Sequence, residues 1–229
     1  MKSILQLTDV RKSFAQPGGG TLTVLDVPQF QIGEAEQVAL IGQSGGGKTT
    51  LLHLIAGLLV PDSGSIQIDG HEMTRLSEQG RDRFRASAIG YVFQTFNLLP
   101  AFTALENVRL GMTFGHGRHN HARAVDLLQR VGLQDRANYR PGQLSVGQQQ
   151  RVAIARALAG KPKLLLADEP TANVDPVSAE SVLDLIRTTC REENVSLLTV
   201  THDMDVAASF DRVEKLDELN RVFADSSVS

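Results

Sequence analysis

The sequence predicts an α/β fold in which the strands of a mostly parallel sheet alternate with helices. Three apolar runs indicate such a sheet: AIGYVFQ (88–94), KLLLAD (163–168) and VSLLTVTH (195–202). They are continuous rather than alternating, as is typical of parallel strands buried on both faces. A fourth run, QVALI (37–41), leads into a glycine-rich turn and then an apolar helical segment. We therefore expect a parallel sheet as the core.

The N-terminal part of the chain predicts an antiparallel β subdomain beside this core. ILQLTDVRKSF (4–14) and TLTVLDVPQFQI (21–32) are rich in β-forming residues and alternate in part. PGGG (17–20) between them is typical of a hairpin loop. A further short strand, SIQI, is expected at 65–68.

Helical patterns separate the later strands. HARAVDLLQRVG (121–132) has helical apolar spacing and ends at a glycine. GQQQRVAIARALAG (147–160) also ends at a glycine, before a Lys-Pro pair. Asp175 and Pro176 supply an N-cap and a first-turn proline for a helix through about residue 191.

The mainly helical stretch 95–160 interrupts the alternation of strands and helices, so we expect it to be an inserted helical subdomain. Residues 1–94 and 161–229 then form the core together with the β subdomain. The whole chain, 1–229, is expected to be a single domain.

Composition excludes several classes of function. The 229 residues are 41% hydrophobic and 21% charged with a net charge of −3, so bulk charge does not favour nucleic acid or anionic lipid. The single cysteine, Cys190, has no partner for an internal disulfide and is expected to be inert in a reducing compartment. The N-terminus shows no leader-like stretch, and the longest apolar run (51–60) is about half a membrane span. We expect a cytosolic protein whose membrane role, if any, comes from a partner.

The stretch GQSGGGKT (42–49) predicts a site for a nucleoside triphosphate. It lies between a strand and a helix, as a phosphate-binding loop does, and its glycines let backbone N–H groups approach a polyphosphate. The helix that follows adds its positive dipole end. Lys48 supplies a charge for the terminal phosphates, and Thr49 supplies a hydroxyl for Mg²⁺. The alternative is a glycine-rich surface turn, which the flanking strand and helix disfavour.

A second signal is KLLLADEP (163–170). Asp168 ends a strand, where it can hold Mg²⁺ through a water molecule, and Glu169 can polarise an attacking water and take its proton. The alternative is an ordinary acidic turn, which the presence of the phosphate loop in the same chain disfavours.

LSVGQQQR (144–151) predicts a capped helix N-terminus. Ser145 at N-cap and Gln148 at N3 fit a capping box. The plain alternative is a well-capped helix and nothing more. The functional interpretation is an anion site formed by Ser145 and Gly147, which a dimer that clamps its nucleotide between subunits requires.

Six motifs occur in a fixed order: GQSGGGKT, Gln94 in YVFQ, LSVGQ, LLLADEP, ANVD (172–175) and His202 in TVTH. They resemble the Walker A, Q-loop, signature, Walker B, D-loop and H-loop of the ATP-binding-cassette (ABC) ATPases, and the resemblance covers nearly the whole chain. FQTFNLLPAFTALENV (93–108) is more specifically similar to bacterial ATPases of lipoprotein-release, macrolide-export and cell-division complexes.

The resemblance implies a P-loop NTPase of ABC type that binds ATP and Mg²⁺ between two copies of the chain, facing head to tail. One chain contributes the residues of the phosphate loop, which are Gly42, Gln43, Ser44, Gly45, Gly46, Gly47, Lys48, Thr49 and Thr50. The other chain contributes Ser145, Gly147 and Gln148. Phe14 matches the aromatic residue that stacks on adenine, although a core position in the β subdomain is its alternative.

The resemblance also implies the catalytic roles. Gln94 and Asp168 join Thr49 around Mg²⁺, while Lys48 holds the β- and γ-phosphates. Glu169 activates water, and His202 contacts the γ-phosphate and keeps the water and Glu169 aligned.

Two positions depart from the family pattern. Val146 stands in the signature where glycine is usual, which narrows the backbone freedom beside the phosphate. Phe14 stands where tyrosine is commoner, which removes a hydroxyl and keeps the stacking face. The catalytic residues are all present, so we predict an active ATPase.

Other residues are expected to be structural. His116, His119 and His121 lack the i,i+4 spacing that places metal ligands on one helix face, so we expect a solvated loop. His53 is expected to pack in the helix behind the phosphate loop. RDRFR (81–85) is expected to be a solvated helix face.

The segment Gln94–Leu105 has many apolar side chains for a connection. They are Phe96, Leu98, Leu99, Phe102 and Leu105. One alternative is local core. The other, which the resemblance implies, is a groove that receives a cytoplasmic helix of a membrane permease, since exposed apolar patches usually mark an interface.

We therefore expect an ATPase subunit, coupled to transport, that drives a separate permease from the inner face of the cell membrane, with export inferred only from the subfamily resemblance. The first alternative is a cell-division-type mechanotransducer that regulates cell-wall enzymes and moves no cargo. A soluble DNA-repair ATPase is disfavoured because Lys48 and Asp168 lie too close in the chain for an inserted coiled coil, and because the composition lacks basic bias. The chain is too short for a two-cassette ribosome factor.

Overall fold

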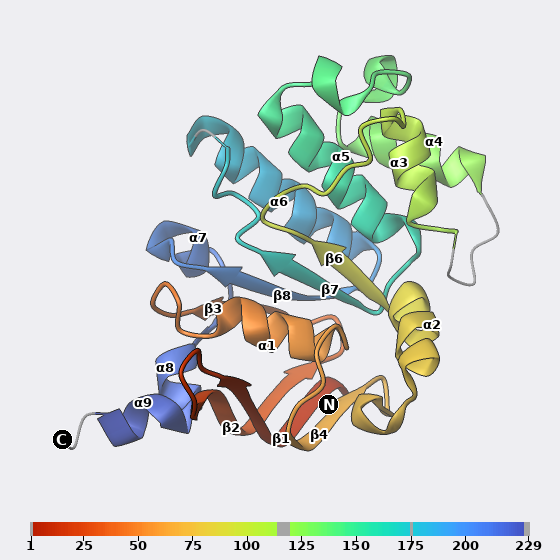
Figure 1. Cartoon of the computed structure of the whole chain (residues 1–229). Helices are drawn as coiled ribbons and strands as arrows, with labels where there is room; N and C mark the ends of the chain where they lie inside the picture. Colours follow the sequence, from red (N-terminus) through yellow and green to blue (C-terminus); the bar gives the residue numbers. More distant parts are fainter. Residues whose placement is uncertain (1, 114–119, 175, 227–229) are drawn as a thin grey trace.

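The structure is a computed structural model that describes residues 2–113, 120–174 and 176–226 (Figure 1). Its core sheet has the strand order β6-β7-β8-β3-β9. These strands are β3 (Gln37–Ile41), β6 (Ile89–Val92), β7 (Leu164–Asp168), β8 (Ser196–Thr201) and β9 (Arg212–Lys215). Every pairing among them is parallel, which confirms the predicted core, although β6 is shorter than the apolar run 88–94.

A second, antiparallel sheet has the strand order β2-β1-β4-β5. Its strands are β1 (Ser3–Ala15), β2 (Thr21–Gly33), β4 (Ser63–Ile68) and β5 (His71–Glu72). Ala15 pairs with Thr21, so the predicted hairpin around 17–20 is confirmed. β2 and β5 are the two edge strands of this sheet.

Helices connect and cover the two sheets. They are α1 (Lys48–Ile55), α2 (Glu78–Ala88), α3 (Ala104–Leu110), α4 (His121–Arg130), α5 (Val146–Ala159), α6 (Pro176–Glu192), α7 (Met204–Ala208), α8 (Leu216–Leu219) and α9 (Arg221–Ser226). Three short 3₁₀ turns cover Met73–Arg75, Gln134–Arg136 and Pro141–Gln143. The structure describes no helix long and apolar enough to cross a membrane in the ranges given above.

The three later helices predicted from the sequence are α4, α5 and α6. His121 is the exposed first residue of α4, and the loop predicted for His116 and His119 lies outside the described residues. The predicted N-cap Asp175 also lies outside them.

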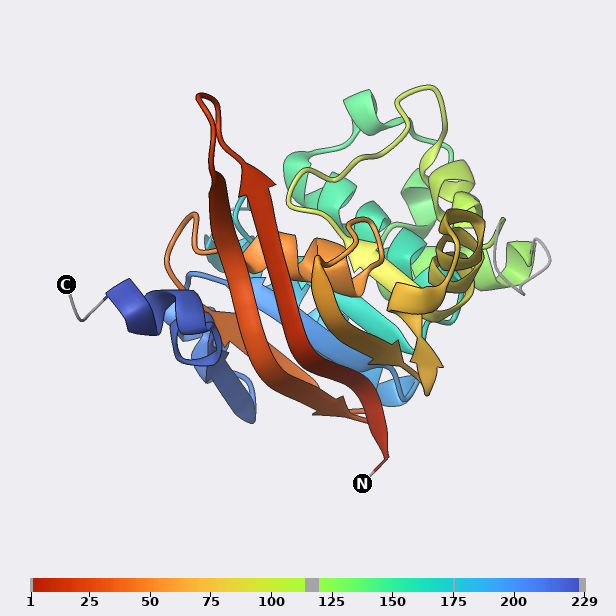
Figure 2. The same ribbon diagram turned by 60° about the horizontal axis from the view of Figure 1, so that its bottom comes forward.

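The parallel sheet is covered on both faces, as its apolar strands require. Along β7, Leu165 and Ala167 belong to a core cluster shared with α4, α5 and α6. Leu164 and Leu166 belong to a second cluster shared with α1 and the antiparallel sheet. Figure 2 shows the antiparallel sheet lying across this second face. The result is a layered α/β fold in which the carboxyl ends of the core strands stay accessible at one edge.

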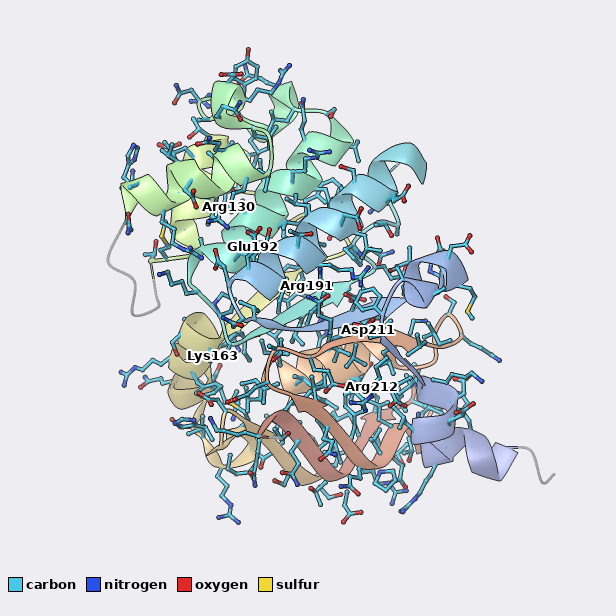
Figure 3. All side chains as sticks on the ribbon, turned by 180° about the vertical axis from the view of Figure 1, so that it is seen from behind. Arg130, Lys163, Arg191, Glu192, Asp211 and Arg212 are labelled. Carbon is cyan, nitrogen blue, oxygen red and sulfur yellow. The ribbon has the colours of Figure 1, made fainter. Side chains whose placement is uncertain are left out.

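The helices of 95–160 are attached to the core on the back of the molecule. Arg123 of α4 pairs with Glu193 at 2.7 Å, and both side chains are largely buried. Arg130 pairs with Glu192 at the end of α6, at 3.0 Å (Figure 3). Because one apolar cluster joins these helices to β7 and β8, the division of the chain at 95–160 stays a prediction.

Candidate active site

The predicted site residues follow the carboxyl ends of adjacent strands. Ile41, the last residue of β3, pairs with Thr201, the last residue of β8. Asp168, the last residue of β7, is also paired with β8. The loop after β3, Glu169 after β7 and His202 after β8 therefore meet at one edge of the sheet, where open α/β sheets bind ligands.

The phosphate loop has a backbone that only glycine adopts easily. Gly45 and Gly47 have φ angles of 77° and 96°, in the left-handed region. At Gly47 the surroundings also leave little room for a side chain, since an ideal Cβ would lie 3.1 Å from side-chain atoms of Val24 and Leu25. The loop is therefore shaped by its glycines and by the strand β2 that lies against it.

Lys48 begins α1 and is only 6% exposed. Its ammonium donates hydrogen bonds to the carbonyl oxygens of Gly42 and Gln43, at 2.7 and 2.8 Å. These carbonyls satisfy the hydrogen-bonding needs of a buried ammonium, and its predicted contact with phosphate oxygens stays a prediction. Gln43, Ser44 and Thr49 are exposed, as residues that meet a ligand must be.

Asp168 is a buried carboxylate with a hydrogen bond from Thr49. Burial raises the pKa of Asp168, while the Thr49 hydrogen bond opposes the rise. A bound cation would compensate for that burial, and the oxygen donors of Thr49, Asp168 and Gln94 are the type that Mg²⁺ prefers. The described residues contain no group of three or more His, Cys, Asp or Glu that could hold a metal alone. The residues therefore fit a Mg²⁺ ion that takes most of its ligands from phosphate and water.

Glu169 is held in a defined orientation beside this carboxylate. Its φ angle is 45°, an uncommon left-handed conformation, and its N–H donates to the carbonyl of Val200 at 2.9 Å. Its Oε1 lies 3.1 Å from Nδ1 of His202. The side chain of Glu169 is 18% exposed and that of His202 is 62% exposed, so the carboxylate contacts an imidazole that is itself open to solvent.

Gln94 lies two residues beyond β6, the strand next to β7. Its side chain is exposed, and its backbone carbonyl accepts a hydrogen bond from Asn173 Nδ2 at 2.8 Å. Gln150, buried in α5, donates to the carbonyl of Pro170 at 2.7 Å. No role was predicted for Asn173 or Gln150, although polar amides inside two motifs are a signal that each orders a turn.

Ser145 caps α5 as predicted. Its hydroxyl accepts from the Gln148 N–H at 3.3 Å, and the Gln148 side chain accepts from the Ser145 N–H at 3.0 Å. Ser145 and the first helical residue, Val146, are exposed. Between described residues, no hydrogen bond joins Ser145 to the phosphate loop. The capped helix end therefore faces outward.

Phe14 lies near the tip of the hairpin, where it pairs with Leu22. It is 39% exposed, which excludes the alternative of a core aromatic. The Lys12 ammonium lies 5.5 Å from the centre of its ring. Stacking on adenine stays a prediction.

A groove of about 670 Å³ lies between α2, β6 and the segment after Gln94. Asp82, Arg83 and Arg85 of α2 line it, and Arg85 also donates to two backbone carbonyls after α1. Asp82 and Arg83 are exposed on α2, as predicted for a solvated helix face, and their place in the groove wall is a further feature that the sequence did not predict. Tyr91, Phe93 and several aliphatic side chains line most of the rest of the groove, together with the polar Asn97 and the charged Arg156.

The five apolar residues predicted for this groove divide between two environments. Leu99 lines the groove and Phe102 is 37% exposed. Leu98 and Leu105 pack against the core cluster of the helices, which is the local-core alternative. The backbone carbonyl of Phe96 accepts from Arg156 of α5 at 2.7 Å, so the segment is fixed to the helix that Ser145 caps.

Residues 25–172 match the family model described as ABC transporter. The chain belongs to the ABC transporter family. It is the ATP-binding and ATP-hydrolysing subunit of that family, as the motifs predicted.

Two relatives of this ABC subunit are lipoprotein-releasing system ATP-binding proteins. LolD 2 of Caulobacter vibrioides is 46% identical over 209 residues, which cover 89% of this chain and 92% of that protein. LolD of Pseudomonas fluorescens is 43% identical over 219 residues, which cover 95% and 96%.

Two solved structures of the ATP-binding cassette MJ0796 resemble this ABC subunit closely. One is a dimeric post-hydrolysis state bound to ADP and Pi, with a TM-score of 0.85 and 37% identity over 92% of this chain and 93% of that chain. The other is a dimeric structure with a TM-score of 0.84 and 38% identity over the same shares. Both confirm the ABC fold of this chain.

Proposed function

We propose that this ABC subunit forms a head-to-tail homodimer around two ATP molecules and powers a membrane complex that releases lipoproteins. The position of Ser145 is the observation that best supports the proposed dimer. It caps an exposed helix N-terminus, a favourable site for anions, yet it makes no hydrogen bond to the phosphate loop in the described part of its own chain. A second copy supplies the missing half, and the similar MJ0796 cassettes are dimeric.

Each site has residues for binding and for hydrolysis. The loop amides and Lys48 hold the triphosphate, and Gln43, Ser44 and Thr50 line its path. Thr49, Gln94 and Asp168 would hold Mg²⁺, which neutralises phosphate charge when bound. Gly147 and Gln148 of the partner accompany its Ser145 at the γ-phosphate. Phe14 stacks on the adenine.

Glu169 acts as the general base. Its carboxylate orients a water molecule for attack on the γ-phosphate and takes the proton that this water loses. His202 holds the carboxylate in place through the 3.1 Å contact, and its exposed imidazole remains free to meet the phosphate. Both residues follow paired strands, so the arrangement is rigid before ATP arrives.

The permease docks in the groove between α2 and the segment Gln94–Leu105. The groove combines an apolar floor with the charged side chains of α2, as an interface with an amphipathic helix requires. Gln94 is adjacent, so a movement of the docked helix reaches the metal site directly. Docking places the subunit at the inner face of the membrane. The released cargo is a lipoprotein, because the relatives belong to lipoprotein-releasing systems.

The test is reconstitution with the membrane protein that co-purifies in detergent. Vesicles that contain the complex and a lipidated reporter should release the reporter into solution when ATP and Mg²⁺ are added. An unlipidated reporter is the matched control. ATP-dependent activation of a cell-wall hydrolase with no release of reporter would instead support the mechanotransducer alternative and overturn lipoprotein release.

A further inference from the structure

The C-terminal end of the described chain lies against the phosphate loop. After β9 the chain forms α8 and α9, and α9 packs beside the edge strand β2 (Figure 2). We propose that residues 216–223, here called the C-terminal brace, position the phosphate loop and thereby set the affinity for nucleotide. The inference rests on the proposed phosphate-binding role of residues 42–49.

Phe223 contacts the middle of the loop. An ideal Cβ on Gly46 would lie 3.5 Å from Cζ of Phe223 and 3.0 Å from the carbonyl oxygen of Gln43. Gly46 itself is buried, and its N–H donates to that carbonyl at 3.1 Å, which closes the turn. The phenyl ring therefore ends within van der Waals distance of the position beside Gly46.

The brace also contacts the start of the loop. An ideal Cβ on Gly42 would lie 3.3 Å from Cβ of Leu216 and 3.5 Å from Oδ1 of Asp217. The same position lies 3.7 Å from Cδ of Lys48. The brace therefore contacts the loop at two separate points. Leu216 and Asp217 lie beside Gly42, and Phe223 lies beside Gly46.

Asn220 fixes the brace to β2. Its side chain is 1% exposed, donates to the carbonyl of Val24 at 2.9 Å and accepts from the N–H of Asp26 at 2.8 Å. These are the outer-edge groups of β2, so Asn220 takes the place that a neighbouring strand would occupy. Val24 and Leu25 are the residues whose side chains bear on Gly47. Asn220 therefore acts on Gly47 indirectly, because it fixes the strand that contacts this glycine.

These contacts affect binding more than chemistry. The loop has four glycines in eight residues, so it loses much conformational freedom when it wraps a polyphosphate. A brace that orders the loop in advance lowers that cost and tightens binding. Glu169 and His202 follow other strands and do not depend on the brace. Phe223 and Asn220 are therefore positioning residues, and their loss should raise KM and leave kcat nearly unchanged.

The test measures binding and turnover separately. Titration calorimetry with a non-hydrolysable ATP analogue and Mg²⁺ should show Kd raised about tenfold in Phe223→Ala and in Asn220→Asp, the size of one lost ordering contact of about 1.4 kcal/mol. Phe223→Leu, which keeps apolar volume, should recover most of the affinity. Arg221→Ala, an exposed position on the same helix, is the matched control and should bind like the parent. Steady-state kcat at saturating ATP should stay within about twofold of the parent.

Thermal unfolding identifies any variant that fails to fold. If Phe223→Ala is such a variant, the comparison uses Asn220→Asp, which should bind more weakly, and Phe223→Leu, which should bind nearly like the parent. Unchanged Kd in both Phe223→Ala and Asn220→Asp would overturn the inference, and so would an equal loss in Arg221→Ala. Lys48→Ala separates this outcome from failure of the proposed site. If Lys48→Ala loses binding while the brace variants do not, the brace is wrong and the phosphate loop stands. If Lys48→Ala binds normally, the site itself is wrong.

Discussion

His202 Nδ1 lies 3.1 Å from Glu169 Oε1, although the two residues follow different strands. The contact depends on the parallel register of β7 and β8, because Asp168 pairs with Val200 just before each side chain leaves the sheet. The imidazole is the more exposed partner of this contact and the carboxylate the less exposed. If Glu169 is the general base, as proposed, a carboxylate held in this way needs little rearrangement when water and phosphate arrive.

Replacing Glu169 with Gln should therefore lower kcat by about 10²–10⁴ and leave ATP binding intact, since the amide keeps the shape and cannot accept the proton. His202→Ala should lower kcat by about 10², at the low end of the same range. The change removes the contact that orients the Glu169 carboxylate and keeps the carboxylate itself. Single-turnover hydrolysis and analogue binding separate the two effects. Parental kcat in Glu169→Gln would remove Glu169 from the mechanism.

Replacing Lys48 with Ala should weaken nucleotide binding itself. The change removes a charge-assisted hydrogen bond worth roughly 1.5–3 kcal/mol, or about 10- to 100-fold in Kd. The buried ammonium bonds only loop carbonyls among the described residues, so the fold should tolerate its loss. Calorimetry with the ATP analogue measures the change, and circular dichroism checks the fold. Undiminished affinity would contradict the assignment of the loop.

Asp168→Asn should stabilise the nucleotide-free protein while it abolishes Mg²⁺-dependent tightening of ATP binding. Burial raises the pKa of Asp168 above its ordinary value of 3.8, so the folded state binds this proton more tightly than the unfolded state. The contribution of Asp168 to the free energy of unfolding is then most favourable below its unfolded pKa of about 3.8. It falls as pH rises toward the raised pKa of the folded state, and above that pKa the full cost of burying the charged carboxylate is present. The amide removes this penalty.

The measurement is the free energy of unfolding in chelator at several pH values. We expect Asp168→Asn to gain up to about 1 kcal/mol at pH 7, an ordinary size for one buried site. The gain should shrink as pH falls through the raised pKa of folded Asp168, because the folded parent then carries a neutral carboxyl. Thr49→Val is the control, because it removes the hydrogen bond and leaves the buried carboxylate. Equal stability of parent and Asp168→Asn at every pH would show that burial carries no cost.

The sequence predicted the parts of this site that depend on local order. Continuous apolar runs predicted β3, β7 and β8, and the polar residues just beyond them are those that the sheet brings together. The capping box at Ser145 was predicted to the residue, since its hydrogen bonds span only three positions.

Contacts between distant segments could not be predicted in this way. The bond of Asn220 to β2 joins residues almost two hundred positions apart, and the short helices around it have no strong apolar period. The role of α2 in the groove was missed for a related reason. Its charged residues are typical of a solvated face, and only the packing of α2 beside β6 shows that they line a wall.

Composite sites at a dimer interface predict complementation between two inactive chains. Ser145→Asp keeps a good N-cap residue, so α5 should fold, while the added charge repels the partner's γ-phosphate. Lys48→Ala disables the other half-site. Each variant alone should hydrolyse ATP at no more than about 1% of the parental rate, because Lys48→Ala removes a charged contact and Ser145→Asp adds a repelling charge in the transition state.

A mixed heterodimer places both defects in one site and leaves its second site intact. Mixing equal amounts should restore up to about a quarter of parental activity, since half the dimers carry one good site of two. A chain with both substitutions is the control and should restore nothing when mixed with either single variant at the same total concentration. If Ser145 acted within its own chain, the mixture would stay inactive, and the head-to-tail arrangement would be wrong.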